Sequence, residues 1–396
     1  MKIAFIYQDQ KLKTGAGCIN SLISSKLAEE GVEMMHLYPK VKLVDSPHHM
    51  KGLNNILFFF SLLEHRNKVL SCDIIQGTTY TPIAFLSFET PIVSHFGSTT
   101  DGFIRATPRT NQTETNLKKI WHELKHAKII DEINIKTRRP LRDIADIENL
   151  VAKRATAIIA TSEIVKKDLI NGGVDGAKIH VVHNAIEDFW FENSPTTIVD
   201  IPSLVYLGRV GQDVFTLKLK GLDRLINTYR SFKYLPKVSI LMTNNKKLSS
   251  WLRDSINANT VHTNLYKPEI KEKLNVLCGG VMLVTSRYEG FCLSIVEGMS
   301  QGLIPVAFPV GVAPEIIQDG VNGYLVNSEK EMVEKIQLIL NDDVLRRKLS
   351  VQALETSKQF NSKNMTEKLL NIYKQIIENK PSKYEKRLSM NKKRHH

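Results

Sequence analysis

The sequence has few cysteines and no long apolar run, and these two absences limit the class of protein. Its four cysteines are scattered without a Cys-x-x-Cys pair, so we expect neither a zinc site nor a disulfide framework. The longest apolar run, Ile56–Leu63, is much shorter than the roughly 20 residues that cross a bilayer. The first apolar stretch, Ile3–Tyr7, is too short for a signal peptide. We therefore expect a reduced, cytoplasmic protein.

Acidic residues are outnumbered: 54 Lys and Arg stand against 41 Asp and Glu, a net charge of +13. Residues 381–396 form a basic, polar tail that is expected to be disordered. A second basic set is interpreted either as a solvated face or as a surface for an anionic membrane or acceptor. No recognisable nucleic-acid motif accompanies it, so nucleic acid is not an expected partner. The set comprises Lys118, Lys119, Lys125, Lys128, Arg138, Arg139 and Arg142.

Short apolar runs alternate with amphipathic helical patterns along the chain, which is typical of α/β proteins. One block of runs precedes residue 184 and a second follows residue 202, with an aperiodic linker between them. We expect two doubly wound sheets, in a first domain over 1–194 and a second over 195–363. The predicted strands cover residues 3–7, 73–76, 92–95, 157–161 and 180–183, then 203–207, 239–242, 260–262, 281–284, 304–307 and 323–326.

The most informative stretch lies between the apolar runs 281–284 and 303–308 and carries two glutamates eight residues apart. It is predicted to be a loop at the carboxyl end of a strand, where open α/β sheets bind ligands, followed by a helix. Glu289 would lie in the loop and Glu297 about two turns into the helix. Backbone N–H groups at the helix start are free to meet an anion. The stretch reads Glu289-Gly290-Phe291-Cys292-Leu293-Ser294-Ile295-Val296-Glu297.

This arrangement resembles the Glu-x7-Glu signature of the retaining GT-B glycosyltransferases of family 4, the glycosyl transferases group 1. The resemblance continues in residues 311–326, which begin Gly311-Val312-Ala313-Pro314-Glu315 and match the family's glycine-rich segment in order. It implies a GT-B fold, in which two Rossmann-like domains face a central cleft. In that fold the last helix, here about 364–380, returns to the first domain.

Two cations and two glycines extend the resemblance to the donor site. Arg209, in Leu207-Gly208-Arg209, and Lys220, in Lys220-Gly221-Leu222-Asp223, resemble the family pair that neutralises a nucleotide diphosphate. The gap between them is longer than usual, and Lys218 is a rival that lacks the following Gly-x-Asp. Gly15 and Gly17 stand where the family has a glycine-rich loop near the diphosphate, although Asn20 replaces a third glycine.

His95 ends a predicted strand of the first block, where family members place a histidine close to the donor sugar. Phe96 stands where an acidic residue is usual, so the detailed role of His95 is left open. Two further segments are interpreted structurally. Residues 184–187 resemble the family hinge, and Thr161-Ser162-Glu163 is typical of a helix N-cap with a possible ligand contact.

The resemblance implies a metal-independent transferase of hexosyltransferase type that retains anomeric configuration. A nucleotide-diphosphate sugar, UDP-linked or else GDP-linked, would donate to a hydroxyl acceptor in cell-surface glycan or glycolipid synthesis. Glu289 would contact the sugar, Glu297 the ribose, and residues 290–293 the diphosphate. No Asp-x-Asp metal motif occurs in the sequence, and no cofactor is expected. The alternatives are another enzyme on the same fold, or a non-catalytic partner or binding subunit of a glycosyltransferase complex. The protein is expected in the cytoplasm, with a peripheral position at the inner face of the membrane as the other option.

Overall fold

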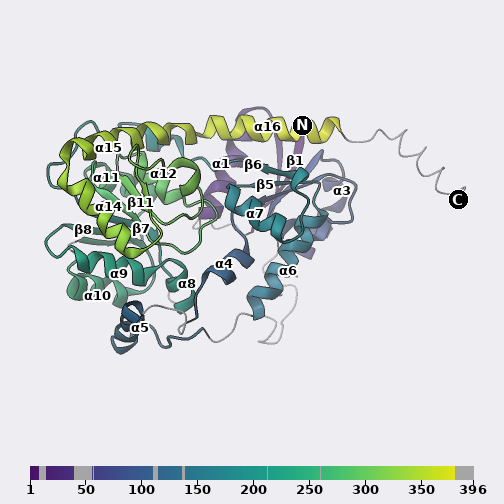
Figure 1. Ribbon diagram of the computed structural model, residues 1–396. Helices are drawn as coiled ribbons and strands as arrows, with labels where there is room; N and C mark the ends of the chain where they lie inside the picture. Colours follow the sequence, from purple (N-terminus) through teal and green to yellow (C-terminus); the bar gives the residue numbers. More distant parts are fainter. Residues whose placement is uncertain are drawn as a thin grey trace, which may run out of the picture.

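The computed structural model describes residues 1–8, 15–39, 56, 58–109, 115–135, 139–211, 213–258 and 260–379. It consists of two lobes, each built on a six-stranded sheet whose paired strands all run parallel (Figure 1). The predicted α/β fold class with two doubly wound sheets is therefore confirmed. Arg138 and the basic tail 381–396 lie outside the described residues.

The first sheet has the order β2-β1-β3-β4-β5-β6. All five residues of β4 are buried, as expected for a parallel strand that is covered on both faces. The edge strand β2 was not predicted, because Glu33 and His36 interrupt its apolar pattern and are exposed. The strands are β1 (Lys2–Ile6), β2 (Glu33–Leu37), β3 (Ile74–Thr78), β4 (Ile92–Phe96), β5 (Ala157–Ala160) and β6 (Ile179–Val181).

The second sheet has the order β12-β11-β10-β7-β8-β9. Read from β9, this is the 3-2-1-4-5-6 order of a Rossmann fold, and the strand order reverses between β7 and β10. Ligands of such sheets bind at that reversal, outside the carboxyl ends of the strands. The strands are β7 (Leu204–Arg209), β8 (Lys237–Met242), β9 (Thr260–Thr263), β10 (Val281–Val284), β11 (Ile304–Ala307) and β12 (Tyr324–Leu325).

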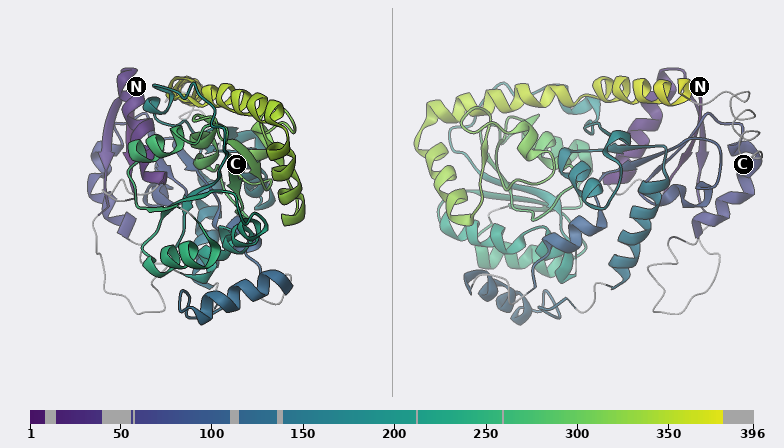
Figure 2. Two further views of the ribbon diagram at one scale, coloured as in Figure 1. Left: turned by 90° about the vertical axis from the view of Figure 1, so that its left-hand side faces the viewer. Right: turned by 45° about the vertical axis from the view of Figure 1, so that its right-hand side comes forward.

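Helices cover the faces of both sheets, as the two further views in Figure 2 show. In the first half they are α1 (Gly15–Glu29), α3 (Arg66–Val69), α4 (Thr100–Ala106), α5 (Thr115–His126), α6 (Arg139–Arg154) and α7 (Glu163–Asn171), with 3₁₀ turns at Phe58–His65, Thr81–Phe85, Gly176–Lys178 and Asp188–Phe191. In the second half they are α8 (Val214–Leu219), α9 (Leu222–Ser231), α10 (Lys246–Ile256), α11 (Lys267–Asn275), α12 (Leu293–Met299), α13 (Ala313–Ile316), α14 (Glu329–Asn341), α15 (Asp343–Ser357) and α16 (Ser362–Glu378), with one 3₁₀ turn at Lys358–Phe360.

The last helix, α16, runs along both lobes and ends against the first (Figure 1). Met365, Leu369 and Tyr373 are buried in the same apolar cluster as Ile3 and Phe5 of β1. The Tyr373 hydroxyl donates a hydrogen bond to the side chain of Gln76 in β3. The first lobe is therefore built from two separate parts of the sequence, the first half of the chain and helix α16.

Helix α5 belongs to the second lobe, although it precedes the linker by about 60 residues in the sequence. Trp121 is fully buried in the core of the second sheet, and its indole Nε1 donates to Asp223 Oδ2 of α9 at 3.2 Å. Glu123 also pairs with Arg230 of α9 at 2.5 Å. A first domain over 1–194 therefore does not hold for this segment, because the apolar face of α5 is covered by α9.

The docking of α5 also separates the predicted basic set. Lys118, Lys119 and Lys125 lie on α5 in the second lobe, whereas Arg142 lies on α6 in the first (Figure 1). These residues therefore do not form a single basic face on the first domain. Among the helices that the structure describes, none combines the length and the apolar character needed to cross a membrane.

Candidate active site

The loop between β10 and α12 carries a closely paired carboxylate. Glu289 Oε1 accepts hydrogen bonds from Lys220 Nζ at 2.5 Å and from Ser286 Oγ at 2.7 Å. Both charged side chains are largely shielded, with 15% of Glu289 and 21% of Lys220 exposed. Burial alone would lower the pKa of Lys220, but the adjacent Glu289 outweighs it and raises that pKa. Two of the predicted site residues thus meet at the carboxyl end of β10.

The turn after Lys220 packs closely against Thr285, which holds Lys220 near Glu289. Gly221 has a φ of +62°, and a Cβ there would lie 1.9 Å from the carbonyl oxygen of Thr285. The Thr285 hydroxyl in turn donates to the carbonyl of Lys220 at 3.1 Å. Lys218, the rival candidate, is fully buried, with its Nζ 5.6 Å from the centre of the Trp121 ring. The two lysines therefore have different surroundings, and only Lys220 approaches Glu289 among the described contacts.

Arg209 is the last residue of β7 and is exposed. Its positive charge lies close enough to Lys220 to oppose the protonation of that lysine, although the effect of Glu289 is larger and the pKa of Lys220 stays raised. Since β7 and β10 are neighbours, the two predicted cations lie where the strand order reverses. Such a site favours an anionic ligand.

The start of α12 is held by unusual backbone geometry and by the first domain. Cys292, the residue before the helix, has a φ of +76° in the left-handed region. Gly290 leaves no room for a side chain, because a Cβ there would lie 1.7 Å from the Gly97 carbonyl oxygen. The Gly290 carbonyl also accepts a hydrogen bond from Ser162 Oγ at 2.5 Å. Anion binding by the backbone N–H groups of Phe291, Cys292 and Leu293 stays a prediction.

Glu297 lies on α12 and takes part in a second charged cluster. Its Oε1 lies 3.3 Å from Lys267 Nζ at the start of α11. The same ammonium group lies 2.7 and 2.8 Å from the two carboxylate oxygens of Glu187. Burial raises the pKa of Glu297, and Lys267 acts against that rise. Glu187 was predicted only to be part of a structural hinge and Lys267 was given no role, because their pairing joins segments 80 residues apart.

The first domain faces these clusters with its helix α1 and with the end of β4. The Cys18 thiol of α1 interacts electrostatically with Lys267 and Glu297, although burial is the main cause of its raised pKa. Gly15 and Gly17 lie in the first turn of α1, and Thr14 lies outside the described residues. His95, in β4, is 4% exposed, and burial lowers its pKa to about 4, so its imidazole is neutral near pH 7. It stands two residues before Gly97, the neighbour of Gly290.

Four contacts that were not predicted join the two domains around this loop through the side chains of Tyr288 and Glu315. Tyr288 OH donates to Asp168 Oδ2 at 2.7 Å and accepts from the Thr99 backbone N–H at 3.2 Å. Glu315 Oε1 accepts from the backbone N–H of Glu163 at 2.9 Å. Its Oε2 lies 2.8 Å from His183 Nε2. The two domains are therefore in contact beside the catalytic candidates at Tyr288, Gly290 and Glu315.

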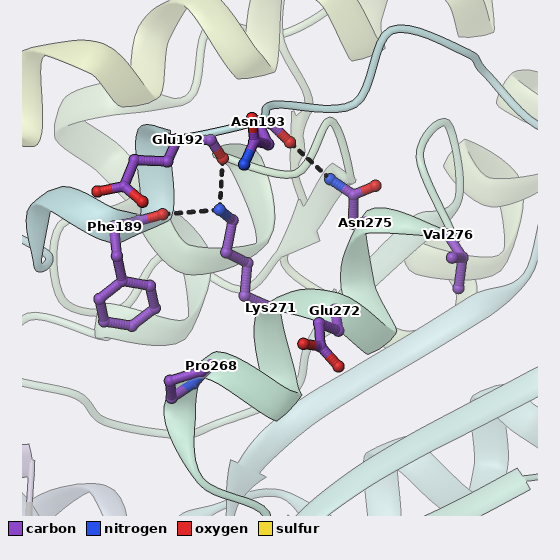
Figure 3. Close-up of a pocket in the computed structure, with 8 residues that line it drawn as sticks. All are labelled: Phe189, Glu192, Asn193, Pro268, Lys271, Glu272, Asn275 and Val276. Atoms are coloured by element: carbon purple, nitrogen blue, oxygen red, sulfur yellow. Dashed lines mark hydrogen bonds between the residues drawn. The ribbon is translucent and has the colours of Figure 1, made fainter.

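A cavity of about 540 Å³ lies elsewhere, and none of the predicted site residues lines it. Residues of the linker and of α11 form its walls (Figure 3). Among the described residues, no group of three His, Cys, Asp or Glu side chains is placed to hold a metal ion. The predicted site residues are thus found in the charged groups around Glu289 and Glu297 and not in this cavity.

Comparison with known proteins gives a family model that matches part of the second half of the chain, and a fold that matches nearly all of it. Residues 213–356 match the family model for glycosyl transferases group 1. The chain is 27% identical over 248 residues to an uncharacterized 41.2 kDa protein in the cps region of Klebsiella pneumoniae, a match that covers 58% of this chain and 64% of that protein, which is less than two thirds of its length.

Two solved structures share the fold over nearly the whole chain. Sucrose-phosphate synthase from Thermosynechococcus elongatus superposes with a TM-score of 0.74 at 15% identity, covering 95% of this chain and 99% of that one. HepE of Anabaena, solved in complex with UDP, superposes with a TM-score of 0.64 at 18% identity, covering 94% and 99%. At such identities the likeness shows the fold, and the predicted GT-B arrangement is confirmed.

Proposed function

From a GT-B fold whose second domain carries a glycosyl transferases group 1 segment, we propose that this chain is a glycosyltransferase that retains anomeric configuration. Its donor would be a nucleotide-diphosphate sugar, with a UDP-sugar favoured and a GDP-sugar possible. One observation carries the proposal. Glu289, Lys220 and Arg209 gather at the carboxyl ends of β7 and β10, where a Rossmann sheet binds its ligand.

The proposed donor site has a sugar end and a nucleotide end. Glu289 contacts the sugar hydroxyls and balances positive charge as the anomeric carbon loses its leaving group. Arg209 and Lys220 receive the diphosphate, since Lys220 is already held beside Glu289 and Arg209 is exposed at the strand end. Glu297 accepts hydrogen bonds from the ribose. The solved relative HepE was crystallised with UDP, which supports the preference for uridine.

In the proposed reaction an acceptor hydroxyl attacks the anomeric carbon from the face that the leaving group occupied. The bond between that carbon and the phosphate oxygen breaks, and the nucleoside diphosphate leaves with both bonding electrons. The acceptor's proton passes to a phosphate oxygen of the donor. His95 is neutral near pH 7 because of its lowered pKa, so in this scheme it donates or accepts a hydrogen bond to the sugar without carrying charge. The closed contact at Gly290 would exclude water.

We further propose that no metal ion is required, because two cationic side chains and the start of α12 face the place of the diphosphate. The acceptor is proposed to be a cell-surface glycan or glycolipid. A net charge of +13 would attract the anionic groups that such acceptors and membranes carry. Liposome flotation with anionic lipids at low salt tests the membrane contact, and a protein that stays in the soluble fraction would contradict it.

A donor screen tests the proposed function. Thermal shift and donor hydrolysis are measured with UDP, GDP and ADP and with their common sugar conjugates, each with and without EDTA. Stabilisation by one nucleotide that EDTA leaves unchanged is the expected result. If no nucleotide stabilises the protein, the chain is instead a non-catalytic subunit. If EDTA abolishes hydrolysis, the claim of metal independence is wrong.

A further inference from the structure

The cluster around Glu297 contains one lysine that is shared by two carboxylates. Lys267 Nζ is shared between Glu187, at 2.7 and 2.8 Å, and Glu297, at 3.3 Å. The exposed fraction is 24% for the lysine and for Glu187, and 9% for Glu297. The two shorter contacts orient the ammonium group toward the linker, and the longer one leaves Glu297 only partly engaged. Trp190 Nε1 also donates to Glu187 Oε2 at 3.1 Å, which holds that carboxylate in place.

Helix α11 holds the linker with a stripe of side chains spaced four residues apart, which places them on one helix face. Lys271 Nζ donates to the carbonyl oxygens of Phe189, at 2.7 Å, and Glu192. Asn275 Nδ2 donates to the carbonyl of Asn193 at 3.2 Å. Figure 3 shows both residues reaching toward the linker. Lys267 begins the same stripe but differs from Lys271, because it contacts Glu297 as well as the linker.

A buried carboxylate without a positive neighbour takes up a proton, and a protonated carboxyl loses much of its capacity to accept hydrogen bonds. Three groups face Glu297 in the described structure: Lys267 of α11, Glu187 of the linker and, at longer range, Cys18 of α1. With one lysine between two carboxylates, the cluster keeps a net negative charge. Lys267 thus acts against the effect of burial on Glu297 and favours the ionised form, which accepts hydrogen bonds from a neutral diol.

We propose that Lys267, oriented by Glu187, is a positioning residue that keeps Glu297 able to accept the hydroxyl groups of the donor's ribose. The inference rests on the proposed function, since it needs a nucleotide donor in the cleft. It adds a role for the segment that joins the two domains. Glu187 lies on that segment, so the ribose site is connected to the linker through Lys267.

The experiment compares ribose with deoxyribose. Calorimetric titration measures the dissociation constants of UDP and 2′-deoxy-UDP, and the corresponding GDP and ADP pairs are run in parallel. For the wild-type protein we expect the ribonucleotide to bind about tenfold or more tightly, because a hydrogen bond to a charged group is lost in the deoxy form. In the Lys267→Met variant this ratio should fall toward one, and in Lys267→Arg it should be largely retained.

Lys271→Met is the matched control, because it removes a lysine from the same helix face and frees the same linker. Its ratio should equal that of the wild type. Should Lys267→Met not fold, as judged by its thermal melt, the Glu187→Gln variant replaces it and should lower the ratio in part.

The possible outcomes separate the two proposals. If nucleotides bind and Lys267→Met weakens both members of a pair equally, the lysine is merely structural and the inference is overturned, while the proposed function stands. If the wild type binds none of the nucleotides, the proposed function fails and the inference fails with it.

Discussion

The two ends of the stretch 289–297 carry the same side chain in different surroundings. Glu289 lies in a loop, pairs with one lysine of its own domain and is 15% exposed beside the contact between the domains. Glu297 lies on a helix, is 9% exposed and belongs to a cluster that includes the linker. A loop carboxylate whose one charged partner is also a cation of the proposed diphosphate site can exchange that partner for a ligand. A buried helical carboxylate with fixed neighbours is better suited to hold a ligand in one orientation.

The largest effect is expected at the loop end. Glu289→Ala should lower the rate of nucleotide release from the sugar nucleotide by about 10²–10³-fold or more, because the proposed function places this charge at the reacting carbon. The melting temperature should also fall, because the largely shielded Lys220 loses its charge partner, so activity is measured well below the melt of the variant. Turnover that survives in this variant would show that the site has been assigned to the wrong residue.

The next largest loss of activity is expected at Gly290, where the backbones of the two domains lie in close contact. A Cβ at Gly290 would lie 1.7 Å from the Gly97 carbonyl oxygen, whereas a Cβ at Gly97 would meet no atom within 4 Å. Gly290→Ala should therefore push the loop away and lower activity by about 10²-fold. Gly97→Ala, on the opposite side of the same contact, serves as the control and should change activity little. Equal losses in the two variants would contradict the importance of this close approach.

A smaller effect is expected at Tyr288, whose hydroxyl joins the second domain to Asp168 and Thr99. Tyr288→Phe keeps the ring and loses these hydrogen bonds, so we expect activity to fall by about fivefold, which corresponds to roughly 1 kcal/mol. Tyr234, which is 90% exposed, provides the matched control in Tyr234→Phe. Compactness is measured by small-angle scattering and activity by a turnover assay. The same compactness and the same activity in both variants would contradict a closing role for Tyr288.

The smallest effect is expected in the pH dependence of thermal stability, through Glu297 of α12. The pKa of Glu297 is raised from 4.5 in the folded protein, mainly by burial, so the folded state binds a proton that the unfolded state has released. Stability from this group is fully present below pH 4.5 and is lost as pH rises through the raised pKa. The melting temperature of Glu297→Gln should therefore increase relative to wild type as pH increases above 4.5. A difference that is constant with pH would argue against it.

Much of the fold could be predicted, because buried parallel strands appear as continuous apolar runs between turn residues. The edge strand β2 escaped, since half-exposed strands lose that pattern. The docking of α5 on the second domain also escaped. An amphipathic helix shows which of its faces is apolar, but its sequence does not say which lobe covers that face.

Lys220 and Glu289 could each be assigned to the donor site, because their motifs lie close to strand ends and keep a recognisable order, but their direct pairing was not predicted. Lys267 and Glu187 lay beyond such reasoning, because neither belongs to a motif and their contact joins the linker to a distant helix. Tyr288 illustrates the same limit. It stands next to Glu289 in the sequence, but only the folded chain brings it to Asp168.

The most direct test of the account separates the two ends of the stretch by what they bind. Calorimetric titration of UDP and UDP-glucose is carried out with the wild type, Glu289→Ala and Glu297→Ala, and with the GDP pair if the donor screen selects guanosine. Glu297→Ala should weaken both the nucleotide and the sugar nucleotide. Glu289→Ala should leave the free nucleotide unchanged and lose only the additional affinity that the sugar provides. If Glu289→Ala weakens the free nucleotide as much as Glu297→Ala does, the division of roles between the two glutamates is wrong.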